Sequence, residues 1–388
     1  MAHDFDTVID RSGTHATKFD DRQRYFGTED VDPLWVADMD FAAPACVTQA
    51  LLARAQHPIY GYTLYPESLY EAVIQWYARR HHWNMQREWM LVGPSALPAL
   101  AATMQALTNP GDGVIIQPPV YTEFAAIIQA NQRRPILNPL IETDGHYTMD
   151  LAQLEHCASQ GARMLLLCSP HNPVGRVWRA DELHEVLRIA RRHDLTVVSD
   201  DIHCDLVYSG ARHTMLGSLA QAGDKIITSI SPGKTFNLQG LGLSALVIPH
   251  EAQRTAVARA FASMHLDQCH PFSITAFEAA YREGDEWLDA LLAYLETTRD
   301  FVADYLRTHI PQIRLVRPQA TYLLWLDCRG LGMDDAALRD FFIKQGKIGM
   351  NPGVIYGAGG SGFMRMNIGA PRQRIRAALE SIKAALTA

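Results

Sequence analysis

The chain has 388 residues, of which 48% are hydrophobic and 20% charged, and its formal net charge is −7. A chain of this length can bury a large core and build two domains, or one large domain with a smaller one. Both signs of charge are interspersed without a basic run, and no window reaches the roughly 18 apolar residues of a membrane span. We therefore expect neither a nucleic-acid partner nor a membrane partner.

The amino-terminal stretch MAHDFDTVIDRSG is polar and acidic, and it lacks the apolar core of a signal peptide. The six cysteines are scattered without a C-x-x-C pair, at positions 46, 157, 168, 204, 269 and 328. This spacing argues against a zinc cage and against a disulfide framework. We therefore expect reduced thiols and a cytoplasmic protein.

From about residue 88 to 250 the sequence alternates between helical and strand patterns. We expect helices at 98–109, 122–131 and 180–193, and strands at 114–117, 164–169, 195–200, 225–230 and 243–248. The strands are short and continuously apolar, and amphipathic helices separate them. This pattern is typical of a parallel sheet covered by helices on both faces, so the fold class is α/β with a mainly parallel sheet.

After about residue 280 the pattern changes. One long amphipathic helix is expected over 286–309, and strands follow in IRLVRP, TYLLWLD and FMRMNIG beside shorter helices. This pattern of helices and strands predicts a smaller α+β domain. We place the large domain at 46–283 and assign 1–45 together with 284–388 to the small domain.

Polar residues follow the predicted strands at the points where ligands bind to such sheets, the carboxyl ends of the strands. The residues expected at this edge are Ser95, Ala96, Tyr121, Asn172, Asp200, His203, Ser231 and Lys234. Each has a structural alternative, because Asn-Pro and Pro-Gly pairs form ordinary turns and Asp200 could cap a helix. Together, however, they supply complementary chemistry that unrelated turns have no reason to share.

This chemistry fits pyridoxal 5′-phosphate (PLP), whose aldehyde condenses with an amine and whose ring needs a carboxylate beside its nitrogen. Lys234 offers the amine, and its pKa should be lowered by desolvation and by neighbouring positive charge. Asp200 would hold the ring nitrogen protonated, Asn172 would donate to the ring oxygen, and Tyr121 would stack on the ring.

PLP also needs an anion site for its phosphate. The N–H groups at the start of the helix near Ser95 and Ala96 would bind this group together with the helix dipole. The hydroxyl of Ser231 would assist.

The ordered set Tyr121, Asn172-Pro173-x-Gly175, Asp200, Ser231-x-x-Lys234 and Arg365 resembles the fold-type-I PLP enzymes, the aminotransferase superfamily, over essentially the whole chain. Within that superfamily, three stretches look like the MalY/PatB-type cystathionine β-lyases, or C–S lyases. They are LWVADMDF (34–41), SDDIHCDL (199–206) and SPGKTFNLQGLG (231–242).

The resemblance implies further roles. Arg365 would bind the α-carboxylate of an amino-acid substrate through its planar guanidinium, and Ala37 would add a backbone contact to the same group. Tyr62 would reach the phosphate of the cofactor in a neighbouring subunit, which implies a homodimer. His203 stands among the cofactor-binding residues at a position where aminotransferases usually carry tyrosine.

Some positions depart from the aminotransferase pattern. Gly242 stands where an arginine usually grips the phosphate, and this change and His203 both also occur in the lyase branch, so they favour a lyase. Against that branch, Asp201 replaces a common glutamate and Ser95 replaces a common glycine.

The leading hypothesis is therefore α,β-elimination from an L-amino acid that bears sulfur at Cβ, giving a thiol, pyruvate and ammonia. Lys234 would be both the tether of the cofactor and the general base. The alternative is a class I/II aminotransferase, which uses the same residues with a 2-keto acid. A third hypothesis is a regulatory or scaffold protein that keeps the fold.

Two patterns resemble other sites. Gly357-Ala-Gly359-Gly-Ser-Gly362 matches G-x-G-x-x-G, but a dinucleotide fingerprint needs a following helix and a strand is expected there. His81-His82 and His193 are expected to be solvated residues at helix ends, and no metal site is predicted.

Overall fold

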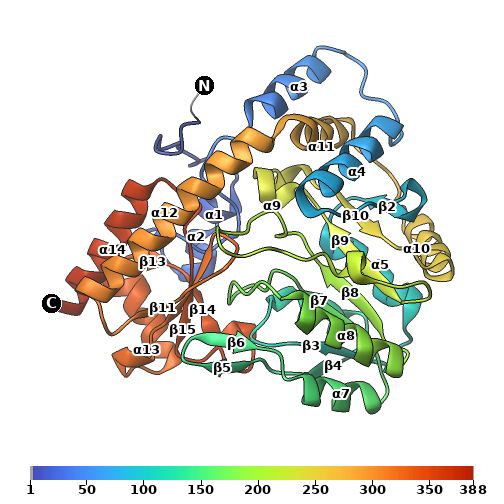
Figure 1. The fold of residues 1–388 in the computed structure, drawn as a ribbon. Coiled ribbons are helices and arrows are strands. Elements are labelled where there is room, and N and C mark those ends of the chain that lie inside the picture. The colour runs from blue at the N-terminus through green and yellow to red at the C-terminus, as the bar shows by residue number, and fades with distance from the viewer. Residues whose placement is uncertain (1–2, 388) are drawn as a thin grey trace.

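The computed structural model describes residues 3–387, and a seven-stranded sheet forms its centre (Figure 1). The strand order is β2-β10-β9-β8-β7-β3-β4. The bounds are β2 (Met90–Gly93), β3 (Gly113–Ile116), β4 (Arg134–Leu137), β7 (Ala162–Cys168), β8 (Thr196–Asp200), β9 (Ile226–Ile230) and β10 (Ser244–Val247). Every residue of β8 and β9 is buried, as expected for strands that carry helices on both faces.

The directions of the strands confirm the α/β class with a mainly parallel sheet. All pairs from β4 to β9 are parallel. The strand expected at 243–248 does not continue this series, because β10 is antiparallel to both β9 and β2. Between β9 and β10 the chain forms only α9 (Gly233–Phe236) and a 3₁₀ turn, so it returns from the same edge of the sheet instead of crossing over to the other.

The expected helices are confirmed within about two residues at each end. They are α5 (Ala96–Leu107), α6 (Thr122–Ala130), α8 (Ala180–Arg192) and the long α12 (Asp285–His309). The other helices are α1 (Thr17–Asp20), α2 (Arg22–Phe26), α3 (Ala45–Ala55), α4 (Glu67–His81), α7 (Leu151–Ser159), α10 (Glu251–Ser263), α11 (Pro271–Glu283), α13 (Asp335–Asp340) and α14 (Arg372–Thr387). None of the helices within residues 3–387 combines the length and apolar character that a membrane crossing requires.

A second, four-stranded antiparallel sheet lies in the carboxyl-terminal part of the chain, in the order β11-β12-β15-β14. Its strands are β11 (Arg314–Val316), β12 (Leu323–Asp327), β14 (Asn351–Pro352) and β15 (Phe363–Asn367). In Figure 1, α12 (orange) runs from α11 toward this sheet and α14. The domain boundaries at 45/46 and 283/284 stay a prediction.

The amino-terminal segment joins the carboxyl-terminal part of the fold. Strand β1 (Asp32–Pro33) pairs in parallel with β13 (Ile348–Gly349). A separate hairpin consists of β5 (Ile141–Thr143) and β6 (His146–Thr148). The pairing of β1 brings the residues that follow it, 34–41, to the carboxyl edge of the central sheet, where Ala37 contacts Lys234.

Candidate active site

Two hollows meet at the carboxyl edge of the central sheet and share Tyr121, Asp200, Ile202 and Lys234 in their walls. The smaller one, which we call the inner hollow, has a volume of about 210 Å³, and the larger one, the outer hollow, about 450 Å³. Predicted residues that line only the inner hollow are Ser95, Ala96 and Ser231; those that line only the outer one are Ala37, Asn172, His203 and Arg365. The structure thus brings together every predicted site residue except Tyr62, which is fully exposed on the segment between α3 and α4.

Lys234 lies on the short helix α9, and its Nζ donates a hydrogen bond to the carbonyl oxygen of Ala37 at 2.7 Å. Burial and, after it, the positive charge of Arg365 lower the pKa of Lys234 to about 8, against the opposing charges of Asp38 and Asp200. An amine with this pKa is partly neutral near neutral pH, which nucleophilic and general-base chemistry both require.

A buried carboxylate fixes α9 from the side away from the hollows. Asp205 accepts hydrogen bonds from the Thr235 hydroxyl at 2.8 Å and from the indole N–H of Trp76 at 3.0 Å. Asp205 makes a second contact with α4 through His81, whose Nε2 lies 2.7 Å from Asp205 Oδ1. Asp205 therefore ties the helix that carries Lys234 to α4.

Asp200 ends β8 with a buried carboxylate. Its Oδ1 has no hydrogen-bond partner among the described residues. Burial and, after it, the neighbouring charge of Asp201 raise the pKa of Asp200 to about 7, while the N–H of Ile202 and the charge of Lys234 oppose the shift. Because an unpaired buried acceptor is costly, this oxygen is poised for a donor supplied by a ligand.

Two more buried groups in the outer hollow have unpaired nitrogens. His203 Nδ1 and Arg365 Nε lack hydrogen-bond partners in the part of the chain that the structure describes. Burial, and then the charges of Lys234 and Arg365, lower the pKa of His203 to about 3, so its imidazole is neutral. The hollow therefore offers a neutral imidazole and a fixed cation.

Arg365 is held on β15 by two acceptors. Its guanidinium donates to the carbonyl oxygen of Trp35 at 2.7 Å and to Asn172 Oδ1 at 3.2 Å. The second bond fixes the Asn172 amide so that its Nδ2 is the donor available to a ligand. The ring of Tyr356 lies 5.3 Å from the guanidinium carbon and supports it from one side.

The start of α5 faces the inner hollow. Ser95 occupies the N-cap position without a side-chain capping bond, which leaves the N–H groups of the first turn free for an anion. The hydroxyl of Ser231 is engaged with the backbone, since it donates to Leu243 O at 2.7 Å and accepts from Gly233 N at 3.1 Å. Gly242 has φ +51°, and a Cβ there would lie 2.8 Å from Pro94 O, so this turn does not accept an arginine.

The family model for aminotransferase class I and II matches residues 32–382. The chain belongs to the aminotransferase class I and II family. Among its relatives, cystathionine beta-lyase PatB of Bacillus subtilis (strain 168) is 40% identical over 99% of this chain and 100% of its own length. Protein MalY of Escherichia coli (strain K12) is 34% identical over 96% of each chain. The crystal structure of cystalysin from Treponema denticola, which contains a PLP cofactor, superimposes with a TM-score of 0.96, 35% identity and coverage of 100% and 99% of the two chains.

Several residues that hold the backbone at 36–38 beside Lys234 were not predicted. The carbonyl oxygen of Ala37 also accepts from Tyr322 at 2.9 Å and from Gln239 at 3.4 Å. Asn367 Nδ2 holds the carbonyl oxygens of Val36 and Asp38, both at 2.6 Å. Gln239 lies in the SPGKTFNLQGLG stretch and was within reach of sequence reasoning, whereas Tyr322 and Asn367 sit inside predicted strands that carry no such signal.

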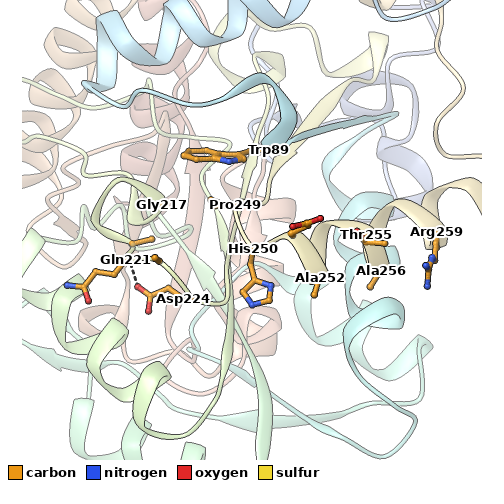
Figure 2. Close-up of a pocket in the computed structure, with 14 residues that line it drawn as sticks. Trp89, Gly217, Gln221, Asp224, Pro249, His250, Ala252, Thr255, Ala256 and Arg259 are labelled. Carbon is orange, nitrogen blue, oxygen red and sulfur yellow. Dashed lines mark hydrogen bonds between the residues drawn. The ribbon is translucent and has the colours of Figure 1, made fainter.

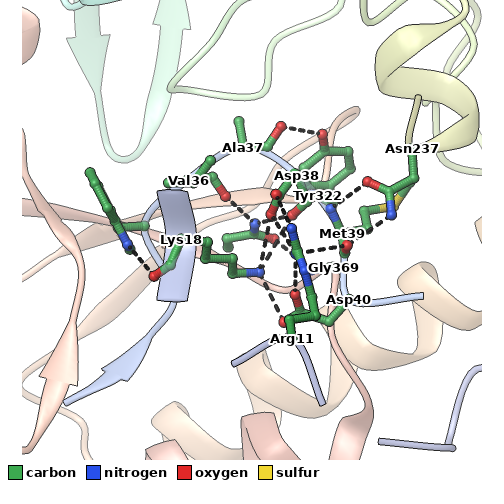
Figure 3. A network of polar contacts seen from close by, with 12 residues as sticks. Arg11, Lys18, Val36, Ala37, Asp38, Met39, Asp40, Asn237, Tyr322 and Gly369 are labelled. Atoms are coloured by element: carbon green, nitrogen blue, oxygen red, sulfur yellow. Dashed lines mark hydrogen bonds and ion pairs between the residues drawn. The ribbon is translucent and has the colours of Figure 1, made fainter. Parts of the chain in front are cut away.

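An ion network anchors the segment 35–41 (Figure 3). Lys18 is fully buried and pairs with Asp40 at 2.9 Å. Arg11 contacts Asp38 at 2.7 Å and Asp40 at 2.8 Å. These charges fix the backbone that contacts both Lys234 and Arg365. Asp38 and Asp40 lie in the LWVADMDF stretch, whereas no motif indicated Arg11 or Lys18.

Two further sequence expectations have clear outcomes. The glycine run 357–362 precedes strand β15, so the helix that a dinucleotide fingerprint requires does not follow it, as predicted.

His81 is not a solvated helix-end residue: its side chain is 6% exposed and pairs with Asp205. The expectation is wrong because α4 packs its last turn against the segment 201–205. His81, Cys204 and Asp205 lie close enough together to hold a metal ion, yet Trp76 and Thr235 already occupy the carboxylate of Asp205.

A separate groove lies around Trp89, Asp224 and His250 (Figure 2). Asp224 precedes β9 and His250 follows the antiparallel β10, so this groove is at the edge of the sheet opposite to Lys234. Among the described residues that line it, none has a buried unpaired polar atom. The candidate active site is therefore the pair of hollows around Lys234.

Proposed function

We propose that this protein is a PLP-dependent C–S lyase, which eliminates the sulfur substituent from Cβ of L-amino acids such as cystathionine or cysteine S-conjugates. One water molecule is consumed, and the products are a thiol, pyruvate and ammonia. The observation that carries the proposal is the placement of Asp200 and Lys234 in the wall of one hollow, the first with an unpaired buried oxygen and the second with a lowered pKa. The relatives named cystathionine beta-lyase support it over nearly the full chain.

The residues present fit PLP. The unpaired Asp200 Oδ1 would accept from the ring N–H, and the free N–H groups at the start of α5 would bind the phosphate. Asn172 would donate to the ring oxygen, and Tyr121 would lie against the ring. When bound, PLP supplies an aldehyde that condenses with amines and a ring that takes up the electrons left behind at Cα.

The chain's own residues then hold the substrate and move protons. Arg365 binds the α-carboxylate, a task for which its fixed guanidinium and unpaired Nε are suited. Lys234 removes the proton from Cα, and its pKa of about 8 places this base close to the operating pH. The proton that Lys234 has taken is then available to the departing sulfur. Asp200 keeps its negative charge toward the ring nitrogen throughout.

We further propose that the working form is a homodimer in which Tyr62 completes the partner's site. The segment before α4 exposes large apolar side chains, namely Ile59, Tyr60, Tyr62 and Leu64. A cluster of this kind is typical of a surface that another protein covers. A second copy would bury it and bring the Tyr62 hydroxyl to the phosphate. We also propose a cytoplasmic location and a role in methionine biosynthesis.

The experiment is a product assay with the purified holoenzyme and cystathionine in the absence of any keto acid. The proposal expects a free thiol and pyruvate in equal amounts. Turnover that requires a keto acid and releases no thiol would instead establish an aminotransferase. A purified protein without the visible absorbance of PLP would favour the scaffold hypothesis.

A further inference from the structure

A second carboxylate lies directly beside Asp200. The side chain of Asp201 is fully buried, and its Oδ1 accepts a hydrogen bond from the Ser199 hydroxyl at 2.6 Å. Its backbone N–H donates to Ser229 O at 2.9 Å, which continues the pairing of β8 with β9. Two consecutive buried carboxylates repel one another, so a structure that keeps both must offset their charge.

The group placed to offset it is His213. Its Nε2 lies 3.5 Å from Asp201 Oδ2, and the two side chains are 2% and 0% exposed. Both imidazole nitrogens of His213 and Oδ2 of Asp201 lack hydrogen-bond partners among the residues that the structure describes. The imidazole and the carboxylate therefore face each other with no competing partner.

Several other titratable groups on the neighbouring elements have partners of their own. On the α4 side, the ring of His81 packs edge-on against His213 at 6.0 Å while its Nε2 contacts Asp205. Cys204 lies beside Tyr77, with 3.7 Å between its Sγ and the Tyr77 hydroxyl. On the side of the hollow, Lys234 and Arg365 contact the carbonyl oxygens of Ala37 and Trp35.

We propose that Asp201 and His213 form a buried charge pair that sets how firmly Asp200 holds a proton on the cofactor's ring nitrogen. The inference rests on the proposed PLP function. A negative charge behind Asp200 makes it a stronger acceptor, and the imidazole of His213 that faces Asp201 limits that effect. Asp201 is thus a positioning residue that acts through Asp200 and never touches the substrate. The raised pKa of Asp200, to which Asp201 contributes after burial, agrees with this direction.

The test uses the holoenzyme and the isosteric variant Asp201→Asn, which can still accept from Ser199. The measured quantity is the midpoint of the change in visible PLP absorbance with pH. Loss of the negative charge should move this midpoint down by about one pH unit, or tenfold in proton affinity. The apoenzyme should also bind PLP about tenfold more weakly in a titration.

Two further variants separate charge from structure. His213→Gln removes the imidazole that faces Asp201 and should move the midpoint in the opposite direction, upward. Asp201→Glu keeps the charge and should restore a midpoint close to that of the unaltered enzyme. If the absorbance midpoints of D201N and H213Q shift in the same direction, or if neither shifts, the proposed charge pair is contradicted. His213→Gln alone decides the question if Asp201→Asn does not fold.

Measurements on the unaltered protein show whether the proposed function or only the charge pair is wrong. If it binds no PLP or releases no thiol from cystathionine, the proposed function fails. If it does both and the variants keep its absorbance midpoint, only the charge pair fails.

Discussion

The amine of Lys234 donates a hydrogen bond to the carbonyl oxygen of Ala37, a residue 197 positions earlier in the chain. The same carbonyl oxygen accepts from Tyr322 on the way into β12. One backbone atom thus connects the amino-terminal segment, the helix of the lysine and the carboxyl-terminal sheet. The acceptor of the amine therefore lies in the segment 35–41, which the network around Lys18 and Asp40 fixes.

Replacement of Lys234 by alanine should abolish thiol release and remove the visible absorbance of PLP, because no other amine lines the two hollows. Circular dichroism should show an unchanged fold. The matched control is Lys225→Ala, which removes a surface lysine that pairs with Asp194 at 2.6 Å. This control should keep both activity and absorbance; equal losses in the two variants would contradict the assignment.

Replacement of Arg365 by alanine should lower kcat/KM by about 10- to 100-fold, since charge-assisted hydrogen bonds contribute about 1.5–3 kcal/mol. PLP absorbance should persist, because the proposed role of the guanidinium is to bind the substrate and not the cofactor. Steady-state kinetics with a cysteine conjugate measures the effect. Arg314, which is largely exposed and pairs with Asp327, provides the control. An R365A enzyme with unchanged kcat/KM would show that another group binds the carboxylate.

Replacement of Asp200 by asparagine should stabilise the apoprotein at pH 8. The folded chain holds the Asp200 proton up to a pKa of about 7, whereas the unfolded chain releases it near 3.8. Folding therefore takes up a proton between these values, and the contribution of Asp200 to stability falls as the pH rises from 3.8 through 7. The Tm advantage of D200N should shrink as the pH is lowered from 7 toward 4.

Thermal unfolding of the two apoproteins across this pH range provides the measurement. A D200N apoprotein that is less stable at every pH would contradict the account of a strained, unpaired carboxylate. The same variant should bind PLP poorly, because the ring nitrogen loses its charged partner.

Mixing two inactive variants tests the role of Tyr62. Chains with Tyr62→Ala and chains with Lys234→Ala should each be weakly active or inactive alone. Random 1:1 dimers should recover about a quarter of the sites, because half of the dimers contain one site with both residues intact. No recovery, together with a dimer in solution, would place Tyr62 outside the partner's site.

Much of this site could be predicted because its residues follow locally recognisable strands. Asp200, Asn172 and Lys234 each stand just beyond a short apolar run, and parallel strands bring their carboxyl ends together. The reversed direction of β10 could not be predicted, since an apolar run carries no signal of strand direction. His81 was misjudged because its partner Asp205 is 124 residues away in the sequence. Tyr322 and Asn367 were missed for the same reason, as their acceptors at 36–38 lie on a distant segment.

The central claim is that Lys234 is the residue that carries the cofactor. Reduction of the PLP-loaded protein with borohydride, followed by mass spectrometry of its peptides, tests this directly. The account predicts a single phosphopyridoxyl group on the peptide that contains SPGKTFN. The modification of a different lysine, such as Lys18 or Lys225, or the absence of any modification in a protein that is visibly yellow, would contradict it.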